Sequence, residues 1–517
     1  MLHFLFLLLL PTLLFFLHKS LSAAGGGGHL PPGPNLCRIL TLKHQIEQNP
    51  RKLFTNLAKL YGPIFSFRAG VHLIVVASSA AAAKEIFSTQ NLRFAARYLP
   101  AVNHSILRTT KTRLPAAIVV AESNAVWKIV RGLGHRSIFS AASVEAAAGI
   151  RAAKAAELVE FLGTQIKEEK AVFIEEIIFA TFANIISTVL TSRNLFLVDK
   201  NGENVRTVIN RLIEMAEKYS RFGLGDMLPF LRRFDFSTKI RGRVVFENAK
   251  SIWGDFVMER KLAMATQVEG CSKTMTRDFL DILLHEDLFA DDGAIEYFLS
   301  EMLMGSTDSV TTITIWLLVE MIKNEEILQK VRKEITDQAV EAGNTISEPG
   351  LAQCEYLQAC IKEALRLHTP SPVVVPRLAS KASIINGYTI PKNTIVLINL
   401  WAIHTDPGMW EDPLMFKPDR FLNSPIAFKG GAIDGAHFEY MPFGGGSRTC
   451  PGSEICRKGV QLMTACLVHY FDWRVPDGND RAVLERGEDQ FWTILKKDEP
   501  LRLIPSLRGD CNNAELD

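Results

Sequence analysis

The most informative stretch of the chain reads Phe443-Gly444-Gly445-Gly446-Ser447-Arg448-Thr449-Cys450-Pro451-Gly452. A lone cysteine follows three glycines and an arginine, and an apolar run with helical spacing comes after it. A cysteine just before a helix and beside a cation has a lowered thiol pKa, because both features favour the thiolate. A thiolate can be the proximal ligand of haem, where it favours O–O bond cleavage. Taken alone, Cys450 would more often be a buried, inert thiol.

The spacing Phe-x-x-Gly-x-Arg-x-Cys-x-Gly resembles the haem-binding loop of the cytochrome P450 family at every defining position. The resemblance implies a mainly α fold with small β-sheets (α+β) and one large haem domain. It also implies haem b as cofactor, with the thiolate of Cys450 as the axial ligand of its iron. By the same resemblance, Phe443 shields the sulfur, glycines including Gly452 bring backbone N–H groups toward it, and Arg448 meets a haem propionate.

The bulk composition indicates one globular domain. No Pro-, Gly- or Ser-rich linker interrupts the chain after about residue 35, so we expect a catalytic domain over residues 36–517. Apolar residues make up 47% of the sequence, enough for a large core, and the net charge of +2 gives no pull toward nucleic acid. The eight cysteines form no CxxC pair, which predicts reduced thiols in a domain that faces the cytosol.

The first 17 residues are almost wholly apolar and end at His18-Lys19, which is near the lower length limit for crossing a bilayer. Because the cations follow the run, we expect an uncleaved anchor over residues 1–19 and a cytoplasmic domain. The glycines and prolines of residues 20–35 predict a spacer and hinge, which resembles the hinge of microsomal family members. That resemblance implies a single-pass protein of the endoplasmic reticulum membrane. A cleaved signal peptide is the competing interpretation, and Asn103-His104-Ser105 would then be a glycosylation acceptor.

Local patterns predict the main elements. Residues 61–78 are expected to form a hairpin of strands with its turn at Ala69-Gly70, and residues 384–398 return to strand character. The irregular pattern of residues 93–125 predicts a long functional loop. Most of residues 127–340 is expected to be helical, including a long apolar helix from Gly293 to Lys323 that polar residues interrupt.

Trp127 and Arg131 are four residues apart, so they share one face of the expected helix. Alone, this pattern indicates a core tryptophan with an arginine whose stem packs beside it. It also matches the family's WxxxR helix, whose Trp and Arg hold a haem propionate. Arg377 stands where the family places another propionate-binding arginine.

The interruption of the long helix reads Gly305-Ser306-Thr307-Asp308-Ser309. Polar groups inside an apolar helix are costly. Hydroxyls there can bond back to the preceding turn, so a purely structural kink is one interpretation. The stretch also resembles the family's oxygen-activation segment, which implies that Asp308 relays protons and Ser309 hydrogen-bonds dioxygen. Ser306 replaces a usual glycine and Ser309 a usual threonine; serine keeps the hydroxyl but loses the methyl group that stiffens χ1.

Glu363 and Arg366 form an i, i+3 pair, which on a surface is worth under about 1 kcal/mol. Arg420 lies between this pair and the Cys450 loop, in the order that the family requires. The resemblance implies that the three residues form a buried network supporting the haem loop.

The resemblance places substrate contacts in four segments, near residues 98–118, 303–305, 371–375 and 491–493. Their mostly apolar side chains favour a lipophilic substrate. The candidate pocket residues are Leu99, Val102, Leu114, Met304, Gly305, Val373, Val374, Val375 and Phe491.

Details around residues 401–430 look like plant microsomal members that hydroxylate terpenoids, alkaloids and phenolics. The resemblance implies an O2-dependent monooxygenase that receives electrons from NADPH through a membrane-bound reductase. One alternative keeps the haem centre but performs coupling, rearrangement or dehydration without inserting oxygen. Another is a membrane-anchored haem protein that acts as a non-catalytic assembly partner.

Overall fold

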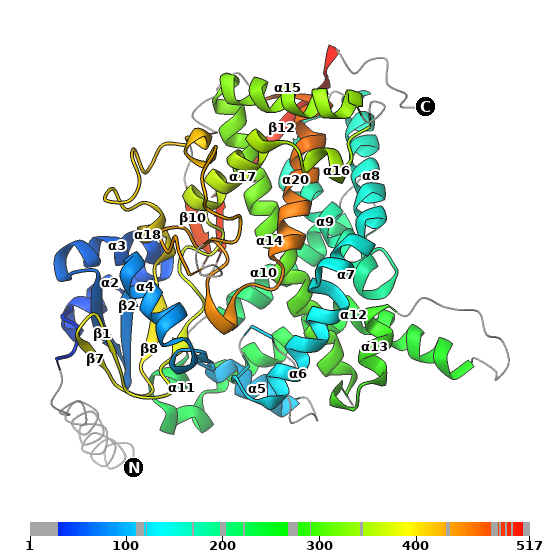
Figure 1. Ribbon diagram of the computed structural model, residues 1–517. Coiled ribbons are helices and arrows are strands. Elements are labelled where there is room, and N and C mark those ends of the chain that lie inside the picture. Colours follow the sequence, from blue (N-terminus) through cyan, green and yellow to red (C-terminus); the bar gives the residue numbers. More distant parts are fainter. Residues whose placement is uncertain are drawn as a thin grey trace.

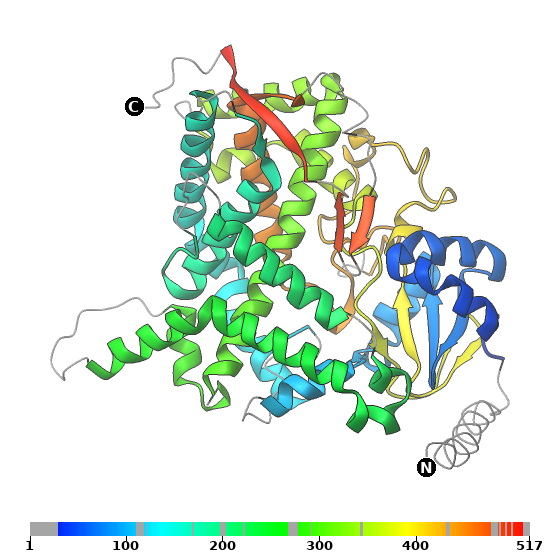
Figure 2. The ribbon, with the colours of Figure 1, turned by 180° about the vertical axis from the view of Figure 1, so that it is seen from behind.

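The computed structural model shows a large helical body with a smaller, strand-rich part at one side (Figures 1 and 2), as the expected mainly α fold requires. The structure describes residues 29–109, 118–119, 121–167, 170–196, 203–220, 223–266, 278–289, 291–341, 345–430, 435–476, 484, 488–491, 494–497 and 500–509.

The helices carry most of the mass. The α-helices are α2 (Leu36–Gln48), α3 (Pro50–Tyr61), α4 (Ala80–Lys84), α5 (Ala101–Thr109), α6 (Ala125–Gly134), α7 (Ala141–Ala146), α8 (Ala148–Lys167), α9 (Ile174–Thr191), α10 (Glu203–Ser220), α11 (Leu224–Met227), α12 (Phe236–Thr266), α13 (Phe279–His285), α14 (Asp292–Lys323), α15 (Glu325–Glu341), α16 (Glu348–Leu351), α17 (Glu355–Leu367), α18 (Leu400–His404) and α20 (Ser453–His469). Short π and 3-10 helices are η1 (Glu85–Thr89), η2 (Asn91–Arg93), η3 (His135–Phe139), η4 (Pro229–Phe234), η5 (Asp287–Phe289), η6 (Pro418–Phe421) and η7 (Gly446–Arg448).

The main sheet has the strand order β1-β2-β8-β5-β3. The expected hairpin is confirmed: β1 and β2 pair antiparallel, with Ile64 opposite Ala77. Its turn lies at Gly70-Val71, one residue later than expected. The strands of this sheet are β1 (Ile64–Ala69), β2 (His72–Ala77), β8 (Ile395–Ile398), β5 (Arg377–Leu378) and β3 (Ala96–Arg97). The smaller sheets contain β4 (Val172–Phe173), β6 (Ser383–Ile385), β7 (Tyr388–Ile390), β9 (Phe471–Arg474), β10 (Glu488–Phe491), β11 (Ile494–Lys497) and β12 (Arg502–Leu507).

The expected long helix is confirmed, and its polar stretch does not break it. α14 runs unbroken from Asp292 to Lys323 and packs against α9, α12 and α20. Its polar residues are accommodated because their hydroxyls bond to carbonyls of the preceding turn: Ser306 to Met302 O at 2.7 Å, and Ser309 to Gly305 O at 3.1 Å. α9 and α14 are long and apolar enough to cross a membrane, but 67% of each apolar window is buried in the fold, as in core helices.

The stretch of residues 93–125, which was expected to be a long loop, contains regular elements. This stretch contains β3 and the helix α5, which packs against α12. Ala101, Val102 and Ile106 of α5 are buried apolar residues, and only Val102 and Ile106 have the i, i+4 spacing of a helix face. Whether such a short helix forms depends on tertiary packing rather than on sequence periodicity.

The proline hinge ends against the sheet. Ser66 on β1 donates its backbone N–H to Pro32 O at 2.8 Å and its hydroxyl to Pro31 O at 2.7 Å. A Cβ on Gly33 would lie 1.7 Å from Ser66 O, so this close approach requires glycine. The expected anchor over residues 1–19 lies outside the described residues.

Candidate active site

Cys450 lies in the loop that joins η7 to α20. Its backbone N–H donates to Phe443 O at 3.0 Å, which closes the loop, and Phe443 is buried with its ring 5.4 Å from that of Phe428. Cys450 lies deep inside the fold and yet keeps accessible surface, so its exposed face opens onto an internal space.

Burial raises the pKa of Cys450, while the Gly452 N–H and the positive charges of Arg131 and Lys429 oppose the rise. The protein alone therefore favours the thiol. A coordinated metal ion deprotonates a thiol outright, so iron binding would overcome this cost. The donors that oppose the rise are groups that would stabilise the thiolate once it forms.

Four buried or half-buried arginines gather beside this loop: Arg97, Arg131, Arg377 and Arg448. Burial lowers the pKa of Arg377 to about 9 and that of Arg448 to about 10, and Arg448 and Arg131 respectively add to these shifts. Burial lowers the pKa of Arg97 most strongly, and the other three arginines lower it further. Among the described residues, none of the four forms an ion pair with a carboxylate.

The guanidinium groups donate mainly to backbone carbonyls. Arg377 Nη2 donates to Gly445 O at 2.7 Å, and Arg131 Nη2 donates to Thr449 O at 2.5 Å. Asn124 caps α6 by accepting from Trp127 N, and the indole of Trp127 lies 3.9 Å from the guanidinium of Arg448. This stacking brings the α6 motif and the Cys450 loop together.

These residues fit haem. Clustered buried cations need anionic partners, and Arg377 Nε is a buried donor with no partner among the described residues. Carboxylates such as the haem propionates would supply both charge and acceptors. A single cysteine that keeps accessible surface in the same loop is a suitable axial ligand.

α14 packs against α20 and carries Gly305 near its middle. Gly305 is exposed although its helix neighbours are buried or half-buried, and a Cβ on it would meet no atom within 4 Å. This part of α14 therefore borders open space, which suits a flat ligand between the helix and the Cys450 loop. Asp308 and Ser309 lie one turn further along α14 and are half-buried.

Glu363, Arg366 and Arg420 form an ion-pair network. Glu363 and Arg366 are both fully buried and make a bidentate pair at 2.7 and 2.8 Å. Arg420 Nε lies 3.1 Å from Glu363 Oε1. Arg366 Nη1 donates to His404 O, and His404 Nε2 accepts from Met441 N at 3.0 Å. The network thereby reaches Met441, which lies in the irregular segment just before the Cys450 loop.

The candidate pocket residues are divided among several parts of the fold. Val102 and Met304 pack into the same apolar cluster, whereas Val373 and Val374 belong to clusters on the sheet side. Leu99 and Val375 are half-buried. Leu114 lies outside the described residues, and Phe491 is described only as the last residue of β10.

Three residues near this site were missed from the sequence. Arg97 donates to Val119 O and Val375 O, and His404 connects α18 to Met441. Glu301 on α14 accepts from Ile118 N and Val119 N. Their partners are 22 to 278 positions away, so no local pattern could identify them.

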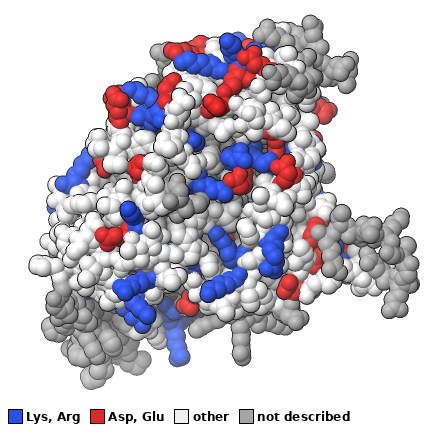
Figure 3. All heavy atoms as spheres, in the orientation of Figure 1, with Lys and Arg blue, Asp and Glu red and all other residues white. Residues whose placement is uncertain are grey.

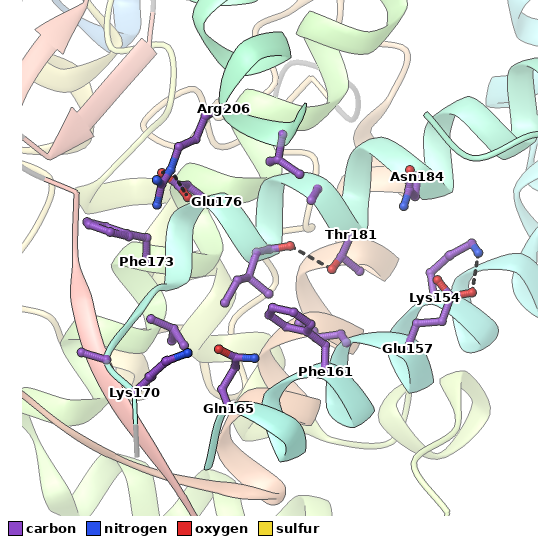
Figure 4. A pocket seen from close by; sticks show the side chains of 16 residues that line it. Lys154, Glu157, Phe161, Gln165, Lys170, Phe173, Glu176, Thr181, Asn184 and Arg206 are labelled. Atoms are coloured by element: carbon purple, nitrogen blue, oxygen red, sulfur yellow. Dashed lines mark hydrogen bonds and ion pairs between the residues drawn. The ribbon is translucent and has the colours of Figure 1, made fainter. Parts of the chain in front are cut away.

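A separate hollow of about 230 Å³ lies between α8 and α9 (Figure 4). Its charged groups pair with one another: Lys154 with Glu157, and Arg206 with Glu176. None of the predicted site residues lines it. The chemistry-bearing residues thus gather at the Cys450 loop and α14, not here.

The chain was compared with known proteins. The cytochrome P450 family model matches residues 30–504. (S)-N-methylcoclaurine 3'-hydroxylase isozyme 1 from Papaver somniferum is 33% identical over 96% of this chain and 98% of its own length. Corytuberine synthase from Coptis japonica is 34% identical over 93% and 95% respectively. A solved zebrafish cytochrome P450 with progesterone has a TM-score of 0.68 and 24% identity, covering 89% of this chain and 99% of that one.

Proposed function

The chain belongs to the cytochrome P450 family, and we propose that it inserts one oxygen atom from O2 into a lipophilic plant metabolite. Its class is that of a cytochrome P450 monooxygenase with a haem–thiolate centre. The observation that carries the site assignment is the accessible surface of Cys450 beside four buried or half-buried arginines, none of which forms an ion pair with a carboxylate in the described part of the chain.

Haem supplies the activation of O2 and the oxidation of the substrate when it is bound. The chain would hold it through the Cys450 thiolate and through charge-assisted bonds from Arg131, Arg377, Arg448 and also Arg97 to the propionates. Trp127 would orient Arg448 by stacking beneath its guanidinium. Phe443 would keep water from the sulfur, because its ring is packed and buried.

Proton delivery is assigned to α14. Asp308 is a carboxyl group on a mainly apolar helix, one turn from the open face at Gly305. A carboxyl group in such a position can give up a proton and take another from solvent. Ser309 would hold dioxygen by rotating its hydroxyl away from Gly305 O, to which it donates in this structure.

The substrate class rests on the pocket and on the relatives. Val102, Met304, Val373 and Val374 are apolar side chains, so a lipophilic molecule is favoured. The Papaver relative is named as a hydroxylase of N-methylcoclaurine. An alkaloid is therefore placed ahead of a terpenoid or a phenolic.

Electrons would come from NADPH through a cytochrome P450 reductase. Figure 3 shows several Lys and Arg side chains on the face that carries α6 and the Cys450 loop, with Asp and Glu between them. Lys128 and Arg136 are exposed there, whereas Lys458 is paired with Glu145 and Glu348. Lys128 and Arg136 are the better candidates for contact with an acidic reductase surface.

Membrane association is supported by a surface patch in addition to the apolar N-terminal run. Figure 1 shows α11 at the end of the molecule where the described chain begins. Exposed apolar residues gather on α11, on η4 and at the start of α12, and we call this surface the η4 patch. They are Leu224, Met227, Phe230, Phe234, Phe236 and Ile240. Exposed Arg233 and Lys239 lie among them, a composition that suits anionic lipid headgroups. We place the protein in the endoplasmic reticulum membrane, with a single span and a cytoplasmic domain.

The test is product analysis under labelled O2. The full chain, co-expressed with a plant reductase, would be supplied with benzylisoquinoline alkaloids, terpenoids and phenolics. We expect NADPH-dependent formation of a product with one labelled oxygen atom. A product without label would reject the insertion mechanism.

A second candidate is oxidative coupling or rearrangement on the same haem centre. Ser306 and Ser309 depart from the usual oxygen-activation segment, and the Coptis relative is named as a synthase. The same labelling experiment separates the two, because coupling joins or reorganises substrate atoms without incorporating oxygen from O2.

A further inference from the structure

Glu301 is a carboxylate on α14 that the oxygen chemistry does not use. Its Oε2 accepts from Ile118 N at 2.7 Å and its Oε1 from Val119 N at 2.8 Å. Among the described residues, no Lys, Arg or His side chain forms an ion pair with Glu301, although the charge of Arg448 is near enough to lower its pKa. Burial raises the pKa of Glu301 to about 7. Like Cys450, it lies deep in the fold and still keeps accessible surface, so it borders an internal space.

Glu301 shares one face of α14 with the oxygen-activation segment. Tyr297 and Gly305 are four residues before and after it, a spacing that aligns side chains along a helix. Gly305 borders open space, so Glu301 lies on the same side one turn away. The rise of a helix makes Gly305 about 6 Å, and Ser309 about 12 Å, distant along the axis.

Other polar groups lie near Glu301. Tyr219 Oη on α10 and Asn103 Oδ1 on α5 are buried, and the two side chains interact with each other. Burial raises the pKa values of Tyr219 and Tyr297, and the nearby charge of Glu301 raises both further. Three helices thus bring one carboxylate and several oxygen atoms together.

We propose that Glu301 is the substrate anchor and takes the protonated amine of a lipophilic, basic substrate. A desolvated carboxylate without a cation gains most from pairing with an ammonium group, because the interior screens their attraction weakly. Each carboxylate oxygen can accept a second hydrogen bond beyond those from residues 118–119. Tyr219, Tyr297 and Asn103 add acceptors for N–H groups. This inference rests on the proposed function and narrows its substrate class.

The position of Glu301 also sets the distance between the basic nitrogen of the substrate and the carbon that is oxidised. With the ammonium at Glu301, the oxidised carbon would lie beside the stretch from Gly305 to Ser309. The separation of nitrogen and oxidised carbon is therefore about 6–12 Å, from the helix rise. An aromatic ring or a branched carbon skeleton at that distance from a basic nitrogen meets the requirement.

The alternative is that Glu301 only fixes the loop at residues 118–119. A matched ligand pair distinguishes the two roles: N,N-dimethyl-4-phenylbutylamine, which is protonated at pH 7.5, and its neutral carbon isostere (5-methylhexyl)benzene. Each is titrated into the haem-loaded full chain, and the spectral shift of the haem gives the dissociation constant. We expect about tenfold or tighter binding of the amine, the ratio for a charge-assisted hydrogen bond.

Glu301→Gln should remove this preference and leave the isostere constant within about twofold, since its carbonyl still accepts one loop N–H. Glu301→Asp should keep part of the preference because it keeps the charge. Tyr297→Phe, which leaves the loop contacts intact, should reduce the preference by a smaller factor.

Equal binding of the two ligands by the unsubstituted chain would overturn the proposal. So would an equal loss for both ligands in Glu301→Gln, the mark of a purely structural role, or a spectrum of direct nitrogen ligation to iron. A chain without amine preference that still inserts labelled oxygen would refute the anchor and leave the proposed function standing.

Discussion

At Asp308 the chain places a carboxyl group one turn beyond the open face of α14. Asp308→Asn keeps the shape and removes the proton-carrying group, so substrate turnover should fall by about 10- to 100-fold, the range of general acid catalysis. Haem content and substrate affinity should stay the same. The measurement is product formation with reductase and NADPH at saturating substrate.

Ser309→Thr is the matched control for that experiment. It restores a stiffer hydroxyl without touching the carboxyl group, so the fraction of NADPH that ends in product should rise. An Asp308→Asn variant with the original turnover rate would remove Asp308 from proton delivery.

His404 gives the chain a defined response to acid. Burial first, and the charge of Arg366 second, lower its pKa to about 3, and its neutral Nε2 accepts from Met441 N. Between about pH 3 and 6.5 the unfolded chain binds more protons at this site than the folded one, so stability rises with pH and is lost on acidification. At pH 5 the loss relative to pH 8 is about 2 kcal/mol.

His404→Gln retains an acceptor for Met441 N but does not titrate. The drop in thermal midpoint from pH 8 to pH 5 should therefore be smaller in the variant than in the unsubstituted chain. Identical drops in both proteins would mean that His404 does not contribute to the pH dependence.

Residue identities could be predicted from the sequence where a motif fixes the spacing. Cys450, Arg448 and Trp127 belong to such motifs, and the structure brings all three together. Arg97 could not be predicted, because what marks it is burial among three arginines that are distant in sequence. Glu301 was hidden for a similar reason, since its partners are backbone N–H groups about 180 residues away.

The stability of α17 and its surroundings depends on the buried charge of Glu363. Glu363 is fully buried between Arg366 and Arg420. Glu363→Gln would leave both cations without a counter-charge, and breaking a buried pair in this way costs about 3–5 kcal/mol. We expect a large fall in thermal midpoint and loss of haem-loaded protein, measured by calorimetry and absorbance.

Glu157→Gln is a control with the same i, i+3 spacing. Its partner is Lys154, and the Glu157 side chain is 45% exposed. Such a pair contributes under about 1 kcal/mol. Equal midpoints for the Glu157 and Glu363 variants would contradict the assigned role of the network.

The elements also show where sequence patterns fail. The hairpin of β1 and β2 was predicted because alternation and a turn are local signals. The long helix α14 was predicted from its apolar run, and the polar stretch inside it stays helical because its hydroxyls bond to carbonyls four residues earlier. α5 was overlooked because its packing against α12, rather than a sequence pattern, stabilises it.

For the whole molecule, the η4 patch predicts a second membrane contact. A chain that starts at residue 29 should still bind vesicles containing anionic lipid. Phe234 and Phe236 are 67% and 66% exposed. Changing both to Ser should weaken vesicle binding about tenfold or more, because each buried aromatic ring contributes about 1.5–3 kcal/mol.

Exposed apolar residues elsewhere provide the control. Ile384 and Met409 are 61% and 52% exposed and lie outside the η4 patch. Changing both to Ser should leave vesicle binding unaltered in a sedimentation assay. Equal weakening in the two double variants would reject a specific membrane face.

The central claim is that Cys450 is the thiolate ligand of haem, and the reduced carbon monoxide spectrum tests it most directly. The unsubstituted chain should give the absorbance band typical of thiolate ligation. Cys456→Ser, a change at a buried thiol six residues away in α20, should keep that band. Cys450→Ser should lose it. A thiolate-type band in Cys450→Ser, or its absence in the unsubstituted haem-loaded chain, would contradict the assignment.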